Sequence, residues 1–126
     1  MERLRFGAVQ LRIMRVLWKR GRANAREITE ALNHRKASIA HSTVQTLLRQ
    51  LEDKKAIAHE VSERTFVYYP LVQEDKVARS ATRELVERLF DGSAGGLVAY
   101  LLKQEKIPRE ELEAIKRLIE EKEGRS

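Results

Sequence analysis

The chain has 126 residues, of which 42% are hydrophobic and 35% are charged, and its formal net charge is +6. This length fits one compact domain or a small domain with an appendage, and the composition excludes a disordered chain and a membrane-spanning one. The absence of cysteine excludes disulfides and thiolate metal sites, and the first residues lack the apolar core of a signal peptide, so we expect a cytoplasmic protein.

Two short helices are predicted in the first part of the chain. Apolar residues at helical spacing predict a helix over Ala8–Arg20, and Gly21 marks its end. Asn24 is predicted to cap a second helix, because Glu27 follows it at the spacing of a capping box. Residues 33–40 are polar and basic, which favours a loop.

A third helix is predicted to begin at Ser42, with Gln45 as the partner in a second capping box. Its apolar positions recur at i, i+3, i+4 and i+7, and they are Val44, Leu47, Leu48 and Leu51. The opposite face has the same spacing and carries hydrogen-bonding side chains without any acid, namely Ser42, Gln45, Thr46 and Arg49. On an isolated amphipathic helix, a solvated surface is the better interpretation of such a face. Here the hairpin that follows and the basic first half of the chain favour a binding surface instead.

The period of the pattern then changes to that of β-strands. Residues 57–62 and 65–69 are β-prone and are separated by Glu63-Arg64, which predicts a hairpin that Pro70 closes. The aromatic residues of this region are expected in the strands and the core, as is the tryptophan of the first helix; they are Phe66, Tyr68, Tyr69 and Trp18.

Three further helices are predicted after the hairpin. The first covers residues 73–90 and ends at Asp91-Gly92-Ser93, the second is short and strongly apolar, and Pro108 opens the first turn of the last. These helices carry more apolar surface than they can bury alone, which predicts a dimer interface. Its candidate residues are Val77, Ala81, Leu85, Leu89, Leu97, Leu101, Leu102, Leu112, Ile115 and Ile119.

The order of three short helices and a hairpin is that of a winged helix-turn-helix, in which the third helix enters DNA. We therefore predict a mostly α-helical protein with a small β-hairpin wing, divided into a DNA-binding domain over residues 1–72 and a helical dimerisation domain over residues 73–126. Charge supports this division, because residues 1–71 hold 14 Lys+Arg and 7 Asp+Glu, whereas residues 72–126 hold 11 and 12. The basic excess lies where a polyanion would bind.

Basic residues around the third helix are candidates for phosphate contacts, which position a protein on DNA without reading its sequence. Arg64 lies at the tip of the hairpin, Lys54 and Lys55 precede it, and the loop before the third helix adds Arg35, Lys36 and His41. For each of these residues alone, ordinary solvated charge is an equally good interpretation.

Four segments carry a resemblance to a known family, and they are Val16-Leu17-Trp18, Ala25-Arg26-Glu27-Ile28, the run from Ser42 to Leu51, and Tyr68-Tyr69-Pro70-Leu71-Val72. Together they resemble the penicillinase-repressor family, the repressors of β-lactamase and of methicillin-resistance genes. The resemblance runs from about residue 9 to residue 121. It implies a winged-helix domain and a helical dimerisation domain that bind dyad-symmetric operators as a homodimer. Thr43 and Thr46 then belong to the recognition helix, with Ser42 and Gln45 as specificity positions.

The sequence departs from the family pattern at three places. Lys54-Lys55-Ala56 stands where the family usually has Lys-Gly, and roughly Tyr100-Leu101 stands where antibiotic-responsive members are cleaved at an Asn-Phe bond. The resemblance implies an upstream sensor or protease as a further candidate partner, whereas this departure disfavours inactivation by cleavage at an Asn-Phe bond. Copper-responsive relatives carry a cysteine-rich tail that this chain lacks. No cofactor, metal site or catalytic residue is predicted.

Other classes of function remain as alternatives. An enzyme is disfavoured, because the sequence has no P-loop, no Rossmann glycine pattern and no nucleophile elbow, and its three histidines are scattered. A winged-helix adaptor that binds a protein instead of specific DNA would need a more apolar and less basic surface. RNA binding would need a stacking platform, and the aromatics are too few for one.

Overall fold

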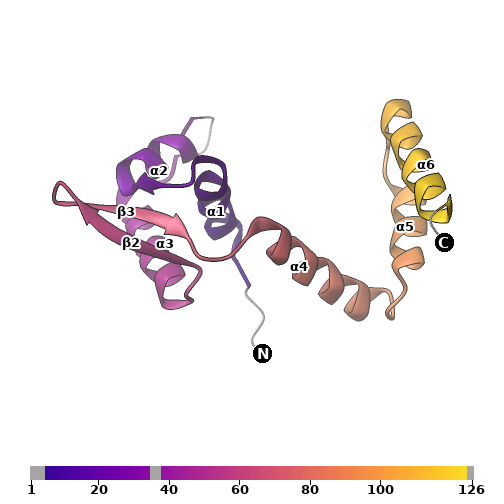
Figure 1. The fold of residues 1–126 in the computed structure, drawn as a ribbon, viewed down its shortest axis with the longest axis horizontal. Helices are drawn as coiled ribbons and strands as arrows, with labels where there is room; N and C mark the ends of the chain where they lie inside the picture. The colour runs from indigo at the N-terminus through magenta and orange to yellow at the C-terminus, as the bar shows by residue number, and fades with distance from the viewer. Residues whose placement is uncertain (1–4, 35–37, 125–126) are drawn as a thin grey trace. The chain divides into compact units, whose positions relative to one another are not determined.

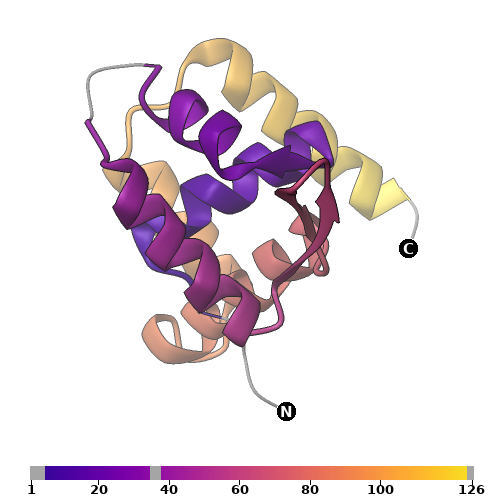
Figure 2. The same cartoon turned by 90° about the vertical axis from the view of Figure 1, so that its left-hand side faces the viewer.

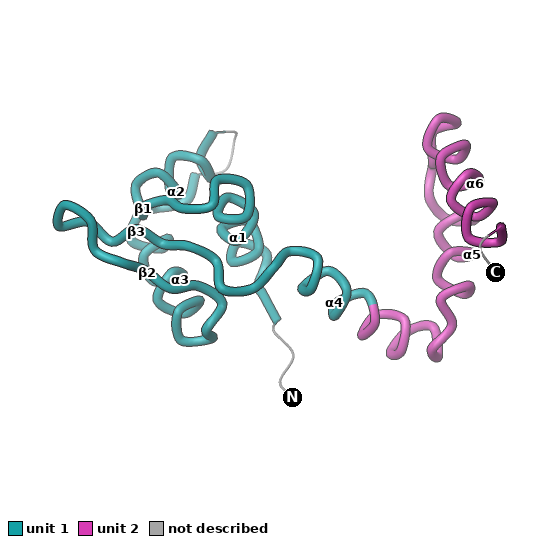
Figure 3. Tube along the Cα trace, viewed as in Figure 1, with its two compact units in different colours: residues 1–82 teal, residues 83–126 magenta. Residues whose placement is uncertain are grey.

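A computed structural model describes residues 5–34 and 38–124 of the chain (Figure 1). The elements in chain order are α1 (Ala8–Arg20), β1 (Ala23–Asn24), α2 (Ala25–Leu32), α3 (His41–Asp53), β2 (Ile57–Ser62), β3 (Thr65–Pro70), α4 (Glu74–Leu89), α5 (Ala94–Gln104) and α6 (Arg109–Gly124). The predicted fold class, mostly helical with a small β-hairpin, is confirmed. The chain forms two compact units, residues 1–82 and 83–126 (Figure 3). The functional boundary expected between residues 72 and 73 stays a prediction.

The hydrophobic core lies in the first unit, where α2, α3 and the strands surround α1 (Figure 2). The three helices and β2 all contribute fully buried side chains, and the largest are Ile13, Met14, Leu17, Ile28, Val44, Leu48, Leu51 and, from β2, Ile57. Trp18 packs against this core as expected, and its indole Nε1–H donates a hydrogen bond to the carbonyl oxygen of Val72 at 2.8 Å. This bond fastens the segment that follows β3 onto α1.

The ends of the first two helices follow the sequence. Gly21 terminates α1 at a φ of +86°, a value that favours glycine, and its N–H donates to the carbonyl of Leu17. The capping box of α2 is present in both directions. The Asn24 side chain accepts from the N–H of Glu27 at 2.8 Å, and the Glu27 carboxylate accepts from the N–H of Asn24 at 2.9 Å.

The predicted start of α3 is wrong by one residue, and the predicted capping box of Ser42 and Gln45 is absent. The helix begins at His41, and Ala40, which has no capping side chain, occupies the cap position. The carbonyl of Ala40 accepts from the N–H groups of Thr43 and Val44, so backbone geometry alone starts this helix. Ser42 and Gln45 therefore do not cap the helix, and both lie exposed on its surface.

The hairpin is accompanied by a strand that the sequence did not predict. β1 pairs antiparallel with β3 and gives a sheet of order β1-β3-β2, with Ala23 opposite Tyr68. A strand of two residues is too short to produce a periodic pattern. The two hairpin strands match the prediction, and their turn residues Glu63 and Arg64 have φ values of +51° and +65°. Two left-handed residues are the signature of a type I′ turn. We call residues 57–70 the wing.

The helices after the wing match the prediction within a few residues. Asp91 and Gly92 have positive φ values and separate α4 from α5. The Ser93 hydroxyl then caps α5 by accepting a hydrogen bond from the N–H of Gly96. The last helix begins at Arg109, so Pro108 precedes its first turn instead of opening it, and the Pro108 carbonyl accepts from the N–H of Leu112. In the part of the chain that the structure describes, we find no helix with the length and apolar character needed to span a membrane.

Candidate nucleic-acid interface

The polar face of α3 is free for contact with a partner. The side chains opposite the buried face are all exposed, and they are His41, Ser42, Thr43, Gln45, Thr46 and Arg49. The Thr46 hydroxyl donates to the carbonyl of Ser42 at 3.1 Å, so its oxygen can still accept a hydrogen bond from a ligand. The Gln45 side chain has no hydrogen-bond partner among the described residues, so its amide can donate and accept toward a ligand.

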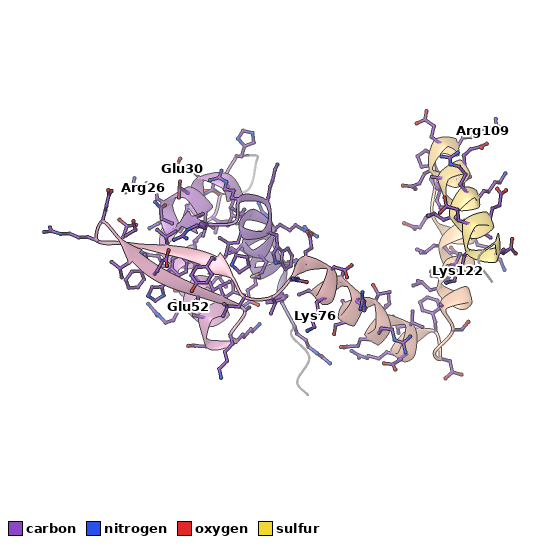
Figure 4. The ribbon with its side chains drawn as sticks, in the orientation of Figure 1. Arg26, Glu30, Glu52, Lys76, Arg109 and Lys122 are labelled. Atoms are coloured by element: carbon purple, nitrogen blue, oxygen red, sulfur yellow. The ribbon has the colours of Figure 1, made fainter. Side chains whose placement is uncertain are left out.

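An open groove of 420 Å³ joins the start of α3 to α2 and the wing. It is lined by Asn24, Ala25, Arg26, His41, Gln45, Arg64, Thr65, Phe66 and Tyr68. The structure thus brings three of the predicted residues, His41, Gln45 and Arg64, to one surface. Arg26, labelled in Figure 4, is a further cation that sequence reasoning missed. The signal that could have found it is its place in the first turn of α2, on the side that carries no core residue.

A hydrogen bond orients the His41 ring at the edge of this groove. His41 Nδ1 lies 2.9 Å from the Thr29 hydroxyl oxygen, and the same hydroxyl lies 2.8 Å from the carbonyl of Ala25. A hydroxyl has a single proton, so when it donates to Ala25 the imidazole must donate from Nδ1. That tautomer leaves Nε2 as an acceptor for a partner, and protonation would turn it into a donor.

The other basic candidates lie apart from the groove or outside the described residues. Arg35 and Lys36 belong to the undescribed stretch, so their predicted phosphate contacts are not located. Lys54 and Lys55 follow the C-terminus of α3, whose 13 residues span about 20 Å. The structure therefore does not bring these two lysines to the groove that His41 and Arg64 share.

Lys54 is engaged with the start of the chain. Its ammonium donates to the carbonyl of Arg5 at 2.6 Å and to Gln10 Oε1 at 2.8 Å, and it lies 5.5 Å from the centre of the Phe6 ring. A phosphate contact by Lys54 would require it to exchange these partners. Lys55 is exposed and has a φ of +64° in the turn that leads into the wing.

A side-chain contact outside the groove joins the wing to α3. His59 on β2 lies 2.6 Å from the Glu52 carboxylate on α3 (labelled in Figure 4), and because a carboxylate only accepts, the imidazole donates from Nδ1. Tyr68 on β3 is buried nearby. Burial raises the pKa of its phenol, the Glu52 carboxylate raises that pKa further, and the Arg49 guanidinium lowers it. The contact between His59 and Glu52 therefore ties β2 of the wing to α3.

The predicted dimer residues differ in exposure. Four of them are half-buried, namely Val77, Leu97, Leu112 and Ile115, and six are exposed, namely Ala81, Leu85, Leu89, Leu101, Leu102 and Ile119. Among the described residues of α5 and α6, none is buried. The peptide bond between Tyr100 and Leu101, at the place that matches the family's cleavage site, lies inside α5.

Comparison with known proteins identifies the family. The family model described as penicillinase repressor matches residues 6–121, nearly the whole chain. The chain belongs to the penicillinase repressor family. Among members, the penicillinase repressor of Bacillus licheniformis is 27% identical over 116 residues, which cover 92% of this chain and 90% of that protein. The methicillin resistance regulatory protein MecI of Staphylococcus aureus is 24% identical over 110 residues, covering 87% and 89%. The family is one of repressors rather than of enzymes.

Solved structures agree with the penicillinase repressor assignment at the level of the fold. The solution structure of the DNA-binding domain of the repressor BlaI matches with a TM-score of 0.52 and 30% identity, over 58% of this chain and 88% of that one. The YusO protein of Bacillus subtilis matches with a TM-score of 0.51 and 19% identity, over 94% and 75%, which shows a shared fold only. The winged-helix assignment made from the sequence is thereby confirmed.

Proposed function

We propose that this protein is a transcriptional repressor that binds a dyad-symmetric DNA operator as a homodimer, with α3 in the major groove. The observation that carries the proposal is the groove in which the start of α3, the start of α2 and the wing tip present Gln45, Arg26 and Arg64 together. A DNA major groove is wide enough for a helix, and its phosphates flank the bases that such a helix reads. A DNA partner also implies a cytoplasmic location.

The residues of this surface divide into two roles. We assign base contacts to the exposed hydrogen-bonding side chains of α3, which are Ser42, Thr43, Gln45 and Thr46. Phosphate contacts fall to cations at the edge of the groove, of which Arg64 at the wing tip and Arg26 on α2 are the best placed. Arg49, exposed on the same face of α3, is compatible with either role.

A homodimer is supported by the apolar surface of the C-terminal unit. Leu89 of α4 is 72% exposed and Leu118 of α6 is 63% exposed, and several further leucines are exposed to a lesser degree. Exposed apolar side chains in such number mark a contact with another protein. A two-fold symmetric pairing would present two α3 helices to one palindromic site. An upstream sensor or protease is a further proposed partner, and cleavage at Tyr100-Leu101 would require local unwinding of α5.

Salt dependence of binding tests the proposal. Fluorescence anisotropy with a labelled duplex from the region upstream of the protein's own gene gives the affinity at two salt concentrations. If a dimer neutralises about six phosphates, the affinity should fall by roughly three orders of magnitude between about 50 and 200 mM salt. A shuffled duplex serves as the control and should bind more weakly throughout. Affinity that is flat across this range, or equal for both duplexes, contradicts the proposal and favours a protein-binding adaptor.

A further inference from the structure

The wing exposes two large apolar side chains on one face. Phe66 is 48% exposed and Val61 is 63% exposed, and the two residues lie opposite each other in the register of β2 and β3. The sequence pattern assigned Phe66 to the strand and core. The strand assignment is confirmed, but the ring lies at the surface. An aromatic residue exposed beside a proposed DNA-binding helix is a candidate for contact with the DNA.

The Phe66 ring is held in place by its neighbours. It stacks on the imidazole of His59 with the ring centres 3.9 Å apart and an angle of 12° between the planes. His59 in turn donates to the Glu52 carboxylate of α3. This chain of contacts fixes the ring relative to the recognition helix before any partner binds. A contact made by a preorganised aromatic ring costs little conformational entropy.

Phe66 lines the proposed DNA-binding groove, whereas Val61 does not. The other lining residues are mostly polar or charged, and Phe66 is the largest wholly apolar side chain among them. It therefore provides an apolar wall in the groove that also contains Gln45 and Arg64. A polar groove with one rigid apolar wall is suited to a ligand that presents carbon atoms beside its charged groups.

We propose that Phe66 contacts an apolar carbon of the operator, either the C5-methyl group of a thymine or the carbon atoms of a deoxyribose. This inference rests on the proposed function, because it names a further contact residue of the same surface. The thymine methyl group is the one apolar feature that DNA bases present in the major groove, and phenylalanine is one of the side chains that recognise it. Deoxyribose carbons flank the phosphates that Arg64 at the wing tip would contact.

The experiment compares full-length variants on one duplex synthesised in two forms. Wild-type protein first enriches a binding sequence from a pool of random duplexes, and that sequence is then made with thymine and with deoxyuridine, which lacks the methyl group. Affinities are measured for wild type, Phe66→Ala, Phe66→Leu and Val61→Ala. Val61→Ala is the matched control, since it removes an exposed apolar side chain from the same face of the wing but outside the groove. Thermal unfolding verifies that each variant is folded.

Phe66→Ala should weaken binding about ten-fold, whereas Val61→Ala should leave the affinity within about two-fold of wild type. Phe66→Leu, which restores apolar surface, should recover part of the loss. If the contact is to thymine, deoxyuridine weakens wild type about three- to ten-fold and leaves Phe66→Ala unaffected. If it is to deoxyribose, the Phe66→Ala loss is equal on both duplexes.

Three outcomes overturn the inference, and they are distinguishable. If a folded Phe66→Ala variant binds the enriched duplex as tightly as wild type, the inferred contact is ruled out and the proposed function is unaffected. If wild type enriches no sequence from the pool, both the proposed function and the inferred contact are ruled out. A loss with Val61→Ala as large as that with Phe66→Ala also contradicts the inference, because it would assign the effect to the wing as a whole.

Discussion

Side chains at the groove differ in how firmly the protein already holds them. The Gln45 amide is exposed and unpaired among the described residues, and Arg64 projects from a tight turn at the wing tip. The Lys54 ammonium, in contrast, is bonded to the carbonyl of Arg5 and the amide of Gln10. A side chain without internal partners can bind DNA without first losing hydrogen bonds, so exposed charge by itself is a poor guide to the interface.

Substitutions at Gln45 and Arg64 should distinguish contacts that recognise the DNA sequence from contacts that only position the protein on the DNA backbone. Gln45→Ala should weaken operator binding by about 1–3 kcal/mol and leave binding to unrelated duplex nearly intact, because it removes a base contact. Arg64→Ala should weaken both by similar factors, because a phosphate contact is independent of sequence. Competition binding with specific and shuffled duplexes measures the two effects. Identical behaviour of the two variants would show that the assignment of roles is wrong.

Tyr68 should make the stability of the first unit sensitive to alkaline pH. Burial raises the pKa of its phenol above 10.0, so the unfolded chain loses this proton at a lower pH than the folded protein does. The free energy of unfolding is therefore unaffected by this group below about pH 10, and it falls as the pH rises toward the raised pKa. Denaturant unfolding between pH 8 and pH 11, followed for wild type and Tyr68→Phe, measures this, with about pH 10 as the expected onset. A parallel decline in both proteins would contradict the prediction.

At the scale of the elements, the accuracy of sequence-based prediction depended on local chemistry. The end of α1 at Gly21 and the capping box at Asn24 were predictable, because each depends on a few adjacent residues. The start of α3 was not, because Ser42 has the right chemistry for a cap and yet the backbone of Ala40 begins the helix one residue earlier. Arg26 joined the groove only through the approach of α2 to the wing, which is a tertiary contact.

The same limit applies to the sheet. β1 consists of two residues and exists because β3 offers a free edge beside Ala23 and Asn24. Nothing in a run of two residues distinguishes a strand from a loop. Phe66 was placed in the core on its residue type, whereas the narrow hairpin leaves its ring half exposed. Pairings between distant segments and the exposure of single side chains therefore required the structure.

The double role of Asn24 gives a prediction for this element. Its side chain caps α2, and its backbone pairs with Val67 of β3, so it joins the sheet to the helix that borders the groove. Asn24→Ala should lower the free energy of unfolding by about 1 kcal/mol, because the N–H of Glu27 loses its acceptor. Urea unfolding of the full-length protein measures the loss. Asn24→Asp, which restores the acceptor, is the control and should stay close to wild type.

At the scale of the whole molecule, the two units differ in how completely they bury their apolar side chains. The first unit has a core of completely buried side chains, whereas α5 and α6 contain no buried residue among those described. Apolar surface removed from water is worth about 25 cal/mol per Å², before the costs of association are subtracted. The C-terminal unit therefore has the most to gain from a second copy of the chain.

Truncation and charge insertion should both give monomers. A chain ending at residue 82 keeps every member of the core cluster, so it should remain folded, sediment as a monomer and bind the operator far more weakly. Leu101→Asp in the full-length chain should act in the same direction, because it places a charge in the interface. Gln104→Asp, at an exposed position of the same helix, is the control of equal charge. A truncated protein that remains dimeric would move the interface to the first unit.

The bond between Trp18 and Val72 gives the protein an optical reporter of its own. Trp18 is the single tryptophan of the sequence, so all indole fluorescence comes from one ring. That ring is partly shielded from water, and its N–H is engaged by the backbone where the wing ends and the chain continues toward α4. Emission without any attached dye should therefore shift to longer wavelength whenever this junction loosens. The effect of adding DNA, or of diluting the protein, can then be followed at the contact between Trp18 and Val72 in unmodified protein.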